Sequence, residues 1–209
     1  EFRRVLFRSV LIAAGFRQGL GMAFLTHTVR HHRGEALTDL LDGLKGGWGR
    51  MMSGRIRQEM FADAGIVGYV RSLEITYGLN GWHPHFHSAW FGDRLHTVEQ
   101  VEEFAYGMWS RFDLGVQKAG LRPTLEEAQD WQLVTPRDED GNKLADYLQK
   151  MCDPAGIGWE MSHTQTKTAR DRHKTEPHWS LLPDAIQGVT PEIWLWHEYE
   201  RATDRKSTR

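Results

Sequence analysis

The sequence predicts an α+β domain, because strand-like and helix-like stretches alternate along its 209 residues. Runs rich in β-branched and aromatic residues, typical of strands, lie at 22–29, 66–91 and 131–135. Apolar residues recur at helical spacing over 35–52, 98–112 and 190–202. With 40% hydrophobic residues, the chain can form a core as one domain, with or without appendages.

The first predicted strand and helix carry mainly core residues. In the strand, Thr26 and Thr28 share one face, and both a core role and a direct role in a site are open for them. We interpret His27 as structural. The helix over 35–52 repeats apolar residues at Leu37, Leu40, Leu41, Leu44 and Trp48. Its far end should be weakened by Gly46, Gly47 and Gly49.

A row of histidines follows a tight-turn dipeptide, Asn80-Gly81, which predicts a β-hairpin. In the stretch GWHPHFH, three histidines occupy every second position and therefore share one strand face: His83, His85 and His87. A two-residue turn would place Glu74 opposite His87, a four-residue loop would place it opposite His85, and a three-residue loop would separate them. Either of the first two registers brings a carboxylate within roughly 5 Å of the imidazoles. Such ligands suit Mn²⁺, Zn²⁺ or Fe²⁺, or Mg²⁺ together with substrate phosphate.

The second half of the chain adds three predicted helices and a strand. Thr97 and Gln100 form a capping-box pattern before the helix over 98–112, and the strand 131–135 ends at Pro136. After a polar turn, a short helix over 143–151 places Tyr147 and Lys150 on one face. The last helix, over 190–202, is rich in tryptophan.

The segment 163–178 between these two helices is polar and locally basic. It is either a flexible linker or a DNA-contacting loop in which basic residues bind phosphates. The candidate DNA-binding residues are Lys167, Arg170, Arg172 and Lys174.

Composition restricts the class of protein. The single Cys152 excludes an internal disulfide framework, and no membrane span or signal peptide is recognisable, so we expect a cytoplasmic protein. Residues 1–9 and 204–209 match translations of one sequencing adapter and its reverse complement, and we expect both to be artefacts. Those tails hold six basic and two acidic residues. Without them, the 26 basic and 28 acidic residues of the chain become 20 and 26, a net charge of −6. Any contact with DNA must therefore be local.

Four motifs in order carry a resemblance to a known family. FLT (residues 24–26), SLEIT (72–76), GWHPHFH (81–87) and YLQK (147–150) resemble those of the single-tyrosine, HUH-type replication initiators, or Rep proteins, of rolling-circle plasmids, particularly actinobacterial ones. The likeness extends from about residue 24 to about residue 203. It implies a central antiparallel sheet of the HUH endonuclease type, a ferredoxin-like variant, with helices packed on it. We expect a catalytic domain over 10–160, with a basic loop and a C-terminal helix over 161–203.

The resemblance also implies an activity, the metal-dependent nicking and rejoining of DNA at a plasmid origin, single-stranded or cruciform. Tyr147 would attack the scissile phosphate, assisted by Lys150, while Glu74, His85 and His87 would hold Mg²⁺ or Mn²⁺, with His83 as a further ligand. A host helicase and polymerase would act as partners. Where some members carry a glutamate for the closing hydrolysis, this chain has Lys143, so which acid serves that step is open.

Three alternatives remain. One is another HUH tyrosine nuclease, a transposase or a mobilisation relaxase, although conventional relaxases carry the nucleophile before the histidines. The second is a zinc hydrolase acting on small molecules, which would not need Tyr147. The third is a fragment of a Rep protein that is inactive as it stands.

Overall fold

The computed structural model describes residues 18–134 and 176–204. Within them, a sheet has the strand order β4-β1-β3-β2-β5, and every neighbouring pair is antiparallel. The strands are β1 (Gly21–Thr28), β2 (Ile66–Gly78), β3 (Gly81–Gly92), β4 (Asp130–Val134) and the two-residue β5 (Glu176–Pro177). This arrangement confirms the predicted α+β class, and it is consistent with an HUH-type fold.

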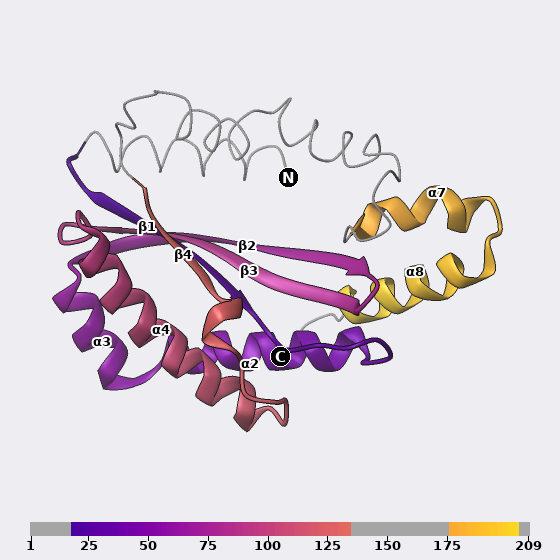
Figure 1. Cartoon of the computed structure of the whole chain (residues 1–209), viewed down its shortest axis with the longest axis horizontal. Helices are drawn as coiled ribbons and strands as arrows, with labels where there is room; N and C mark the ends of the chain where they lie inside the picture. The colour runs from indigo at the N-terminus through magenta and orange to yellow at the C-terminus, as the bar shows by residue number, and fades with distance from the viewer. Residues whose placement is uncertain (1–17, 135–175, 205–209) are drawn as a thin grey trace.

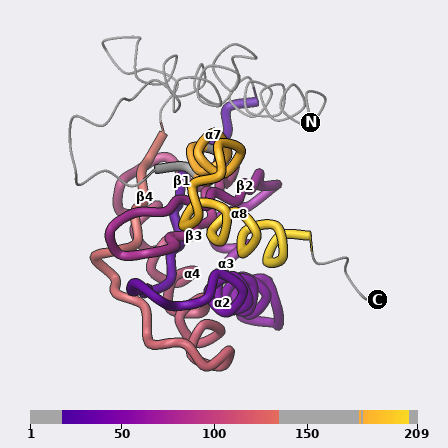
Figure 2. The backbone as a smooth tube through the Cα atoms, turned by 90° about the vertical axis from the view of Figure 1, so that its right-hand side faces the viewer, coloured from indigo at the N-terminus to yellow at the C-terminus, as the bar shows by residue number. Residues whose placement is uncertain are grey.

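The helices of the described residues form two groups. Three of them cover one face of the sheet (Figure 1): α2 (Leu37–Met51), α3 (Gly54–Asp63) and α4 (Val98–Lys118). Two others lie beyond the turn of the β2–β3 hairpin, as the rotated view in Figure 2 also shows: α7 (Leu181–Ile186) and α8 (Thr190–Thr203). The short 3-10 turns η1 (Glu126–Ala128) and η2 (His178–Ser180) precede β4 and α7.

Most predicted elements are present, with two differences. The capping box before α4 is formed, because the Gln100 backbone N–H donates to Thr97 Oγ1 (3.3 Å) and the Thr97 N–H donates to Gln100 Oε1 (3.1 Å). Helix α4 continues to Lys118, beyond the predicted end at Phe112. Helix α3 was not predicted, since none of its residues is buried and it lacks a regular apolar stripe.

The core lies between the sheet and helices α2 and α4. Strand residues that point towards these helices, such as Leu25, Phe86 and Trp90, are 1%, 3% and 0% exposed. Their neighbours along each strand point to the other face, where Phe24, Val70 and further residues form a smaller apolar cluster. Because side chains alternate along a strand, the histidine row belongs to the face opposite the helices.

The register of the β2–β3 hairpin decides which histidine faces Glu74. Tyr77 pairs with Trp82 and Glu74 with His85, so only Leu79 and Asn80 remain in the turn. The alternative register, with Glu74 opposite His87, is wrong. Gly81 follows this turn with a φ of +85°, which is costly for other residues, and an added Cβ would lie 3.2 Å from Arg33 Cα and His32 O.

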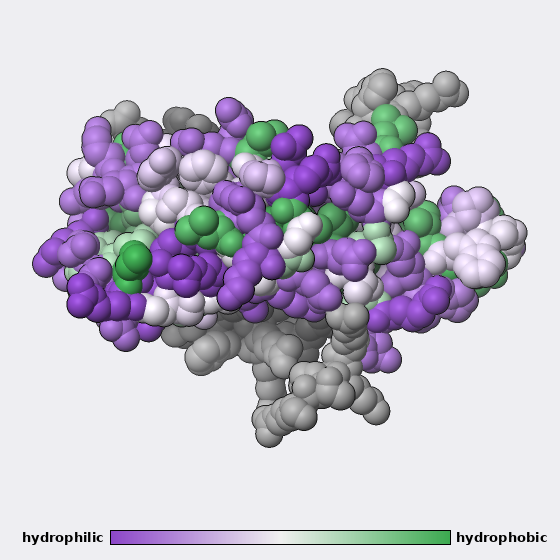
Figure 3. Space-filling model, turned by 90° about the horizontal axis from the view of Figure 1, so that it is seen from below, coloured by the Kyte–Doolittle hydropathy of each residue, from purple (hydrophilic) through white to green (hydrophobic). Residues whose placement is uncertain are grey.

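The outer surface of the helical layer is mainly polar. Seen from the side of α2, α3 and α4, hydrophilic residues predominate and apolar ones are scattered (Figure 3). No helix among the described residues has the length and apolar character needed to cross a membrane.

Candidate metal centre

Three ligand-type side chains converge on the face of the sheet opposite the helices. Glu74 Oε2 lies 2.8 Å from His85 Nε2 and 2.7 Å from His87 Nε2. One ligand atom from each of the three residues lies within 4.8 Å of the other two. The hairpin register creates this cluster, because it sets Glu74 directly across from His85 and one diagonal step from His87.

The FLT motif of β1 holds His87 in place. Thr26 pairs with His87 across the strands, and Thr26 Oγ1 lies 3.0 Å from His87 Nδ1. Phe24 stacks on the same imidazole, with ring centroids 5.6 Å apart and an angle of 16° between the planes. A proton on Nδ1 shared with the hydroxyl leaves the lone pair of Nε2 available to a metal ion. The sequence left the role of Thr26 open, although its spacing from Phe24 indicated that both point to one face.

The charge of the cluster favours a cation. Hydrogen bonds with His85 and with His87 hold the pKa of Glu74 well below its usual range, despite partial burial. The carboxylate is therefore ionised at neutral pH. An anionic oxygen beside two imidazole nitrogens is a ligand set for a divalent metal ion, so these three residues could hold one.

His83 lies beside the cluster and has other partners. Its Nε2 is 2.8 Å from Thr28 Oγ1, and its ring stacks on that of His31 with centroids 4.5 Å apart. The rings of His83 and His85 are 5.0 Å apart. Burial lowers the pKa of His83 to about 4, with His85 contributing, so this ring is neutral at physiological pH. Its role as a further ligand stays a prediction.

The remaining predicted site residues lie outside the described residues. They are the nucleophile Tyr147, Lys150 and the basic residues Lys167, Arg170, Arg172 and Lys174. Their roles, and the domain boundaries proposed above, stay predictions.

The fold and the cluster define an α+β protein with a candidate metal site on an antiparallel sheet. Among curated proteins, the chain is similar to "Protein rep" of Streptomyces lividans, with 27% identity over 241 aligned positions. The alignment covers 88% of this chain and 52% of that relative, so the chain spans about half of its length. This similarity bears out the resemblance to Rep proteins. No family model and no solved structure matches the chain.

Proposed function

We propose that this chain is the catalytic part of a plasmid replication initiator, which nicks single-stranded origin DNA and later rejoins it. The observation that carries the proposal is the Glu74–His85–His87 cluster, in the strand register that sets Glu74 opposite His85. The Rep relative supports the biological setting. The fold alone would not, since one fold serves many activities.

The described residues prepare the site for a phosphodiester. Glu74, His85 and His87 would hold Mg²⁺ or Mn²⁺. The hydroxyl of Thr26 and the stacked ring of Phe24 fix the orientation of the His87 imidazole. When bound, the divalent ion stabilises the charge that develops on the phosphoryl oxygens. Because Glu74, His85 and His87 are held on paired strands, little conformational entropy would be lost in ordering them for the reaction.

Tyr147 is the proposed nucleophile, and Lys150 the residue that holds the scissile phosphate. The phenol loses its proton, its oxygen bonds to phosphorus, and the bond from phosphorus to the 3′ oxygen breaks. That oxygen takes up a proton and becomes a 3′ hydroxyl, which a host polymerase extends after a host helicase opens the duplex. Because one phosphate ester replaces another, the 5′-phosphotyrosine conserves the bond for rejoining.

The first test is covalent capture of DNA. We expect the purified protein to form an adduct with single-stranded oligonucleotides from candidate plasmid origins in Mn²⁺ and not in EDTA, seen on a denaturing gel. Mass spectrometry should place the nucleotide on Tyr147. Metal binding at His85 and His87 without an adduct on any origin would leave two alternatives, a fragment that is inactive as it stands or the small-molecule hydrolase.

Tyr147→Phe should abolish the adduct and leave DNA binding in a gel-shift assay intact, because it removes only the attacking oxygen. Tyr106→Phe is the matched control: Tyr106 lies on α4, on the helical side of the sheet, and is 56% exposed. An undiminished adduct in Tyr147→Phe would refute the assignment of the nucleophile.

A further inference from the structure

The segment Arg30–Arg33 (RHHR) follows β1 and borders the histidine row. His31 stacks on His83 at 4.5 Å with 20° between the planes, and the His83 ring lies 5.0 Å from that of His85. His83 thus lies between His31 of this segment and His85 of the candidate metal centre, and its ring is close to both of theirs. No sequence motif discussed above includes the two arginines.

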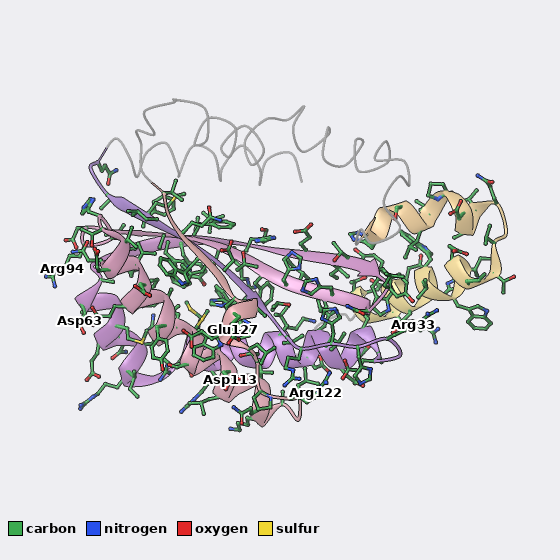
Figure 4. All side chains as sticks on the ribbon, viewed as in Figure 1. Arg33, Asp63, Arg94, Asp113, Arg122 and Glu127 are labelled. Atoms are coloured by element: carbon green, nitrogen blue, oxygen red, sulfur yellow. The ribbon has the colours of Figure 1, made fainter. Side chains whose placement is uncertain are left out.

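The backbone of the segment is held against the hairpin turn. Gly81 approaches Arg33 Cα and His32 O so closely that a Cβ would lie 3.2 Å from both. The His32 N–H donates to Glu35 Oε2 (2.7 Å), and the preceding Val29 is 1% exposed. A positively charged segment thus has a fixed place at the hairpin-turn end of the sheet, where Figure 4 shows Arg33.

Arg30 and Arg33 are exposed and make no ion pair or hydrogen bond from their side chains to any residue within 18–134 and 176–204. Three other exposed arginines have acidic partners, whereas the exposed Arg50 and Arg201 form no ion pair within the described residues. Arg55 pairs with Glu59 (2.9 Å), Arg94 with Asp93 (3.9 Å) and Arg122 with Glu35 (3.3 Å). Two guanidinium groups without acidic partners beside a candidate phosphoryl-transfer site are available to an anionic ligand.

We propose that Arg30 and Arg33 bind backbone phosphates of the DNA strand next to the scissile phosphate, and so set the path of the strand across the metal centre. This inference rests on the proposed function. The planar guanidinium donates two parallel hydrogen bonds to a phosphate, which fixes orientation as well as charge. Because the whole chain has a net charge of −2, its affinity for DNA must come from such local groups.

The test is the salt dependence of binding to single-stranded oligonucleotides, measured by fluorescence anisotropy in EDTA so that binding is separated from nicking. Each phosphate contact on a single strand contributes about 0.7 to the slope of log affinity against log salt. Replacing both residues, Arg30→Gln with Arg33→Gln, should flatten the slope by about 1.4. Unrelated DNA sequences should lose affinity by the same factor, since phosphates carry no sequence information.

Arg55→Gln with Arg94→Gln is the matched control. It removes the same charge from α3 and from the far end of the sheet, where Arg94 is seen in Figure 4, and should leave the slope unchanged. An equal flattening in both double variants would show a bulk charge effect and overturn the inference. So would an unchanged slope in the Arg30/Arg33 variant.

Two further readouts separate the possible failures. Arg30→Lys with Arg33→Lys keeps both charges and should keep the salt slope of the wild type. A slope as flat as that of the glutamine variant would overturn the inference, because the flattening would then not result from the loss of charge. Strand binding by the wild type without any adduct would refute the proposed function alone. An adduct together with equal slopes in the two glutamine variants would refute the role of Arg30 and Arg33 alone.

Discussion

Thr26 is the residue through which β1 acts on the candidate metal centre. Its hydroxyl lies 3.0 Å from His87 Nδ1 and orients the imidazole, although Thr26 is not itself one of the candidate ligands. Residues in this position typically affect metal affinity by about 10- to 100-fold. We therefore expect Thr26→Val, which keeps the shape and removes the hydroxyl, to weaken Mn²⁺ binding by about that factor, as measured by isothermal titration calorimetry.

Thr28→Val is the natural comparison. Thr28 Oγ1 lies 2.8 Å from His83 Nε2, much as Thr26 Oγ1 lies beside His87. Thr28→Val therefore removes a hydroxyl from the same strand face, two residues further along. Equal losses of affinity in the two variants would contradict a special role for Thr26 and would indicate that His83 is a ligand too. A loss confined to Thr26→Val would favour the three-residue ligand set.

The sequence predicted the residues of the candidate metal centre better than the residues that support them. A period of two was sufficient to place His85 and His87 on one face, because side-chain direction in a strand is local. Thr26 precedes His87 by 61 residues, and their contact depends on which strands become neighbours in the sheet. The pairing of β1 with β3 could not be read from either strand alone.

At the scale of elements, two glycines of α2 have a packing role that the sequence did not indicate. The helix reaches Met51, close to its predicted end at residue 52. A Cβ on Gly47 would lie 2.6 Å from the Phe112 ring, and one on Gly115 would lie 2.6 Å from Gly46 O. These glycines therefore allow α2 and α4 to pack with their backbones close together.

This packing predicts opposite effects for two substitutions that both raise helix propensity. Gly115→Ala should destabilise the protein by about 1–3 kcal/mol, because its new methyl group meets backbone atoms that cannot move away. Gly49→Ala has nothing within 4 Å of the new Cβ and should stabilise by about 0.5–1 kcal/mol. Urea unfolding measures both values. A gain of stability in Gly115→Ala would show that the helices are not in close contact there.

Element boundaries show where local patterns are sufficient. Helix α4 begins where its capping box predicted, because a cap is made by neighbours in sequence. The hairpin register remained open among three loop lengths because the sequence fits more than one position of the turn, and the structure places the turn at Leu79 and Asn80.

One face of the sheet packs on helices α2 and α4, and the other face carries the candidate metal centre. Histidines occur on both faces, and their surroundings distinguish a core histidine from those of the candidate metal centre. His27 points into the helical core, where it stacks on Phe112 with ring centroids 4.9 Å apart and meets the edge of Trp48. His85 and His87 point to the other side and meet a carboxylate. The structural interpretation of His27 is thus supported by its place in the core.

The burial of His27 makes the stability of the whole molecule depend on pH. Desolvation lowers its pKa from 6.5 to about 4, with Gln129 offsetting part of the effect. Above pH 6.5 the ring is neutral in both the folded and the unfolded chain, so its contribution is fully present. As the pH falls from 6.5 to 4, the unfolded chain takes up the proton first, and the free energy of unfolding should fall by about 3 kcal/mol before levelling off.

His27→Leu isolates this contribution, because it keeps an apolar side chain in the core and removes the titrating group. Other histidines whose pKa burial lowers, such as His178, contribute equally to both proteins and cancel in the difference. The difference in unfolding free energy between wild type and variant, measured by urea titration from pH 7.5 to 4, should change below pH 6.5 in favour of His27→Leu. Parallel pH profiles would mean that His27 gains a proton in the folded state as readily as in the unfolded chain, and that this part of the core admits water.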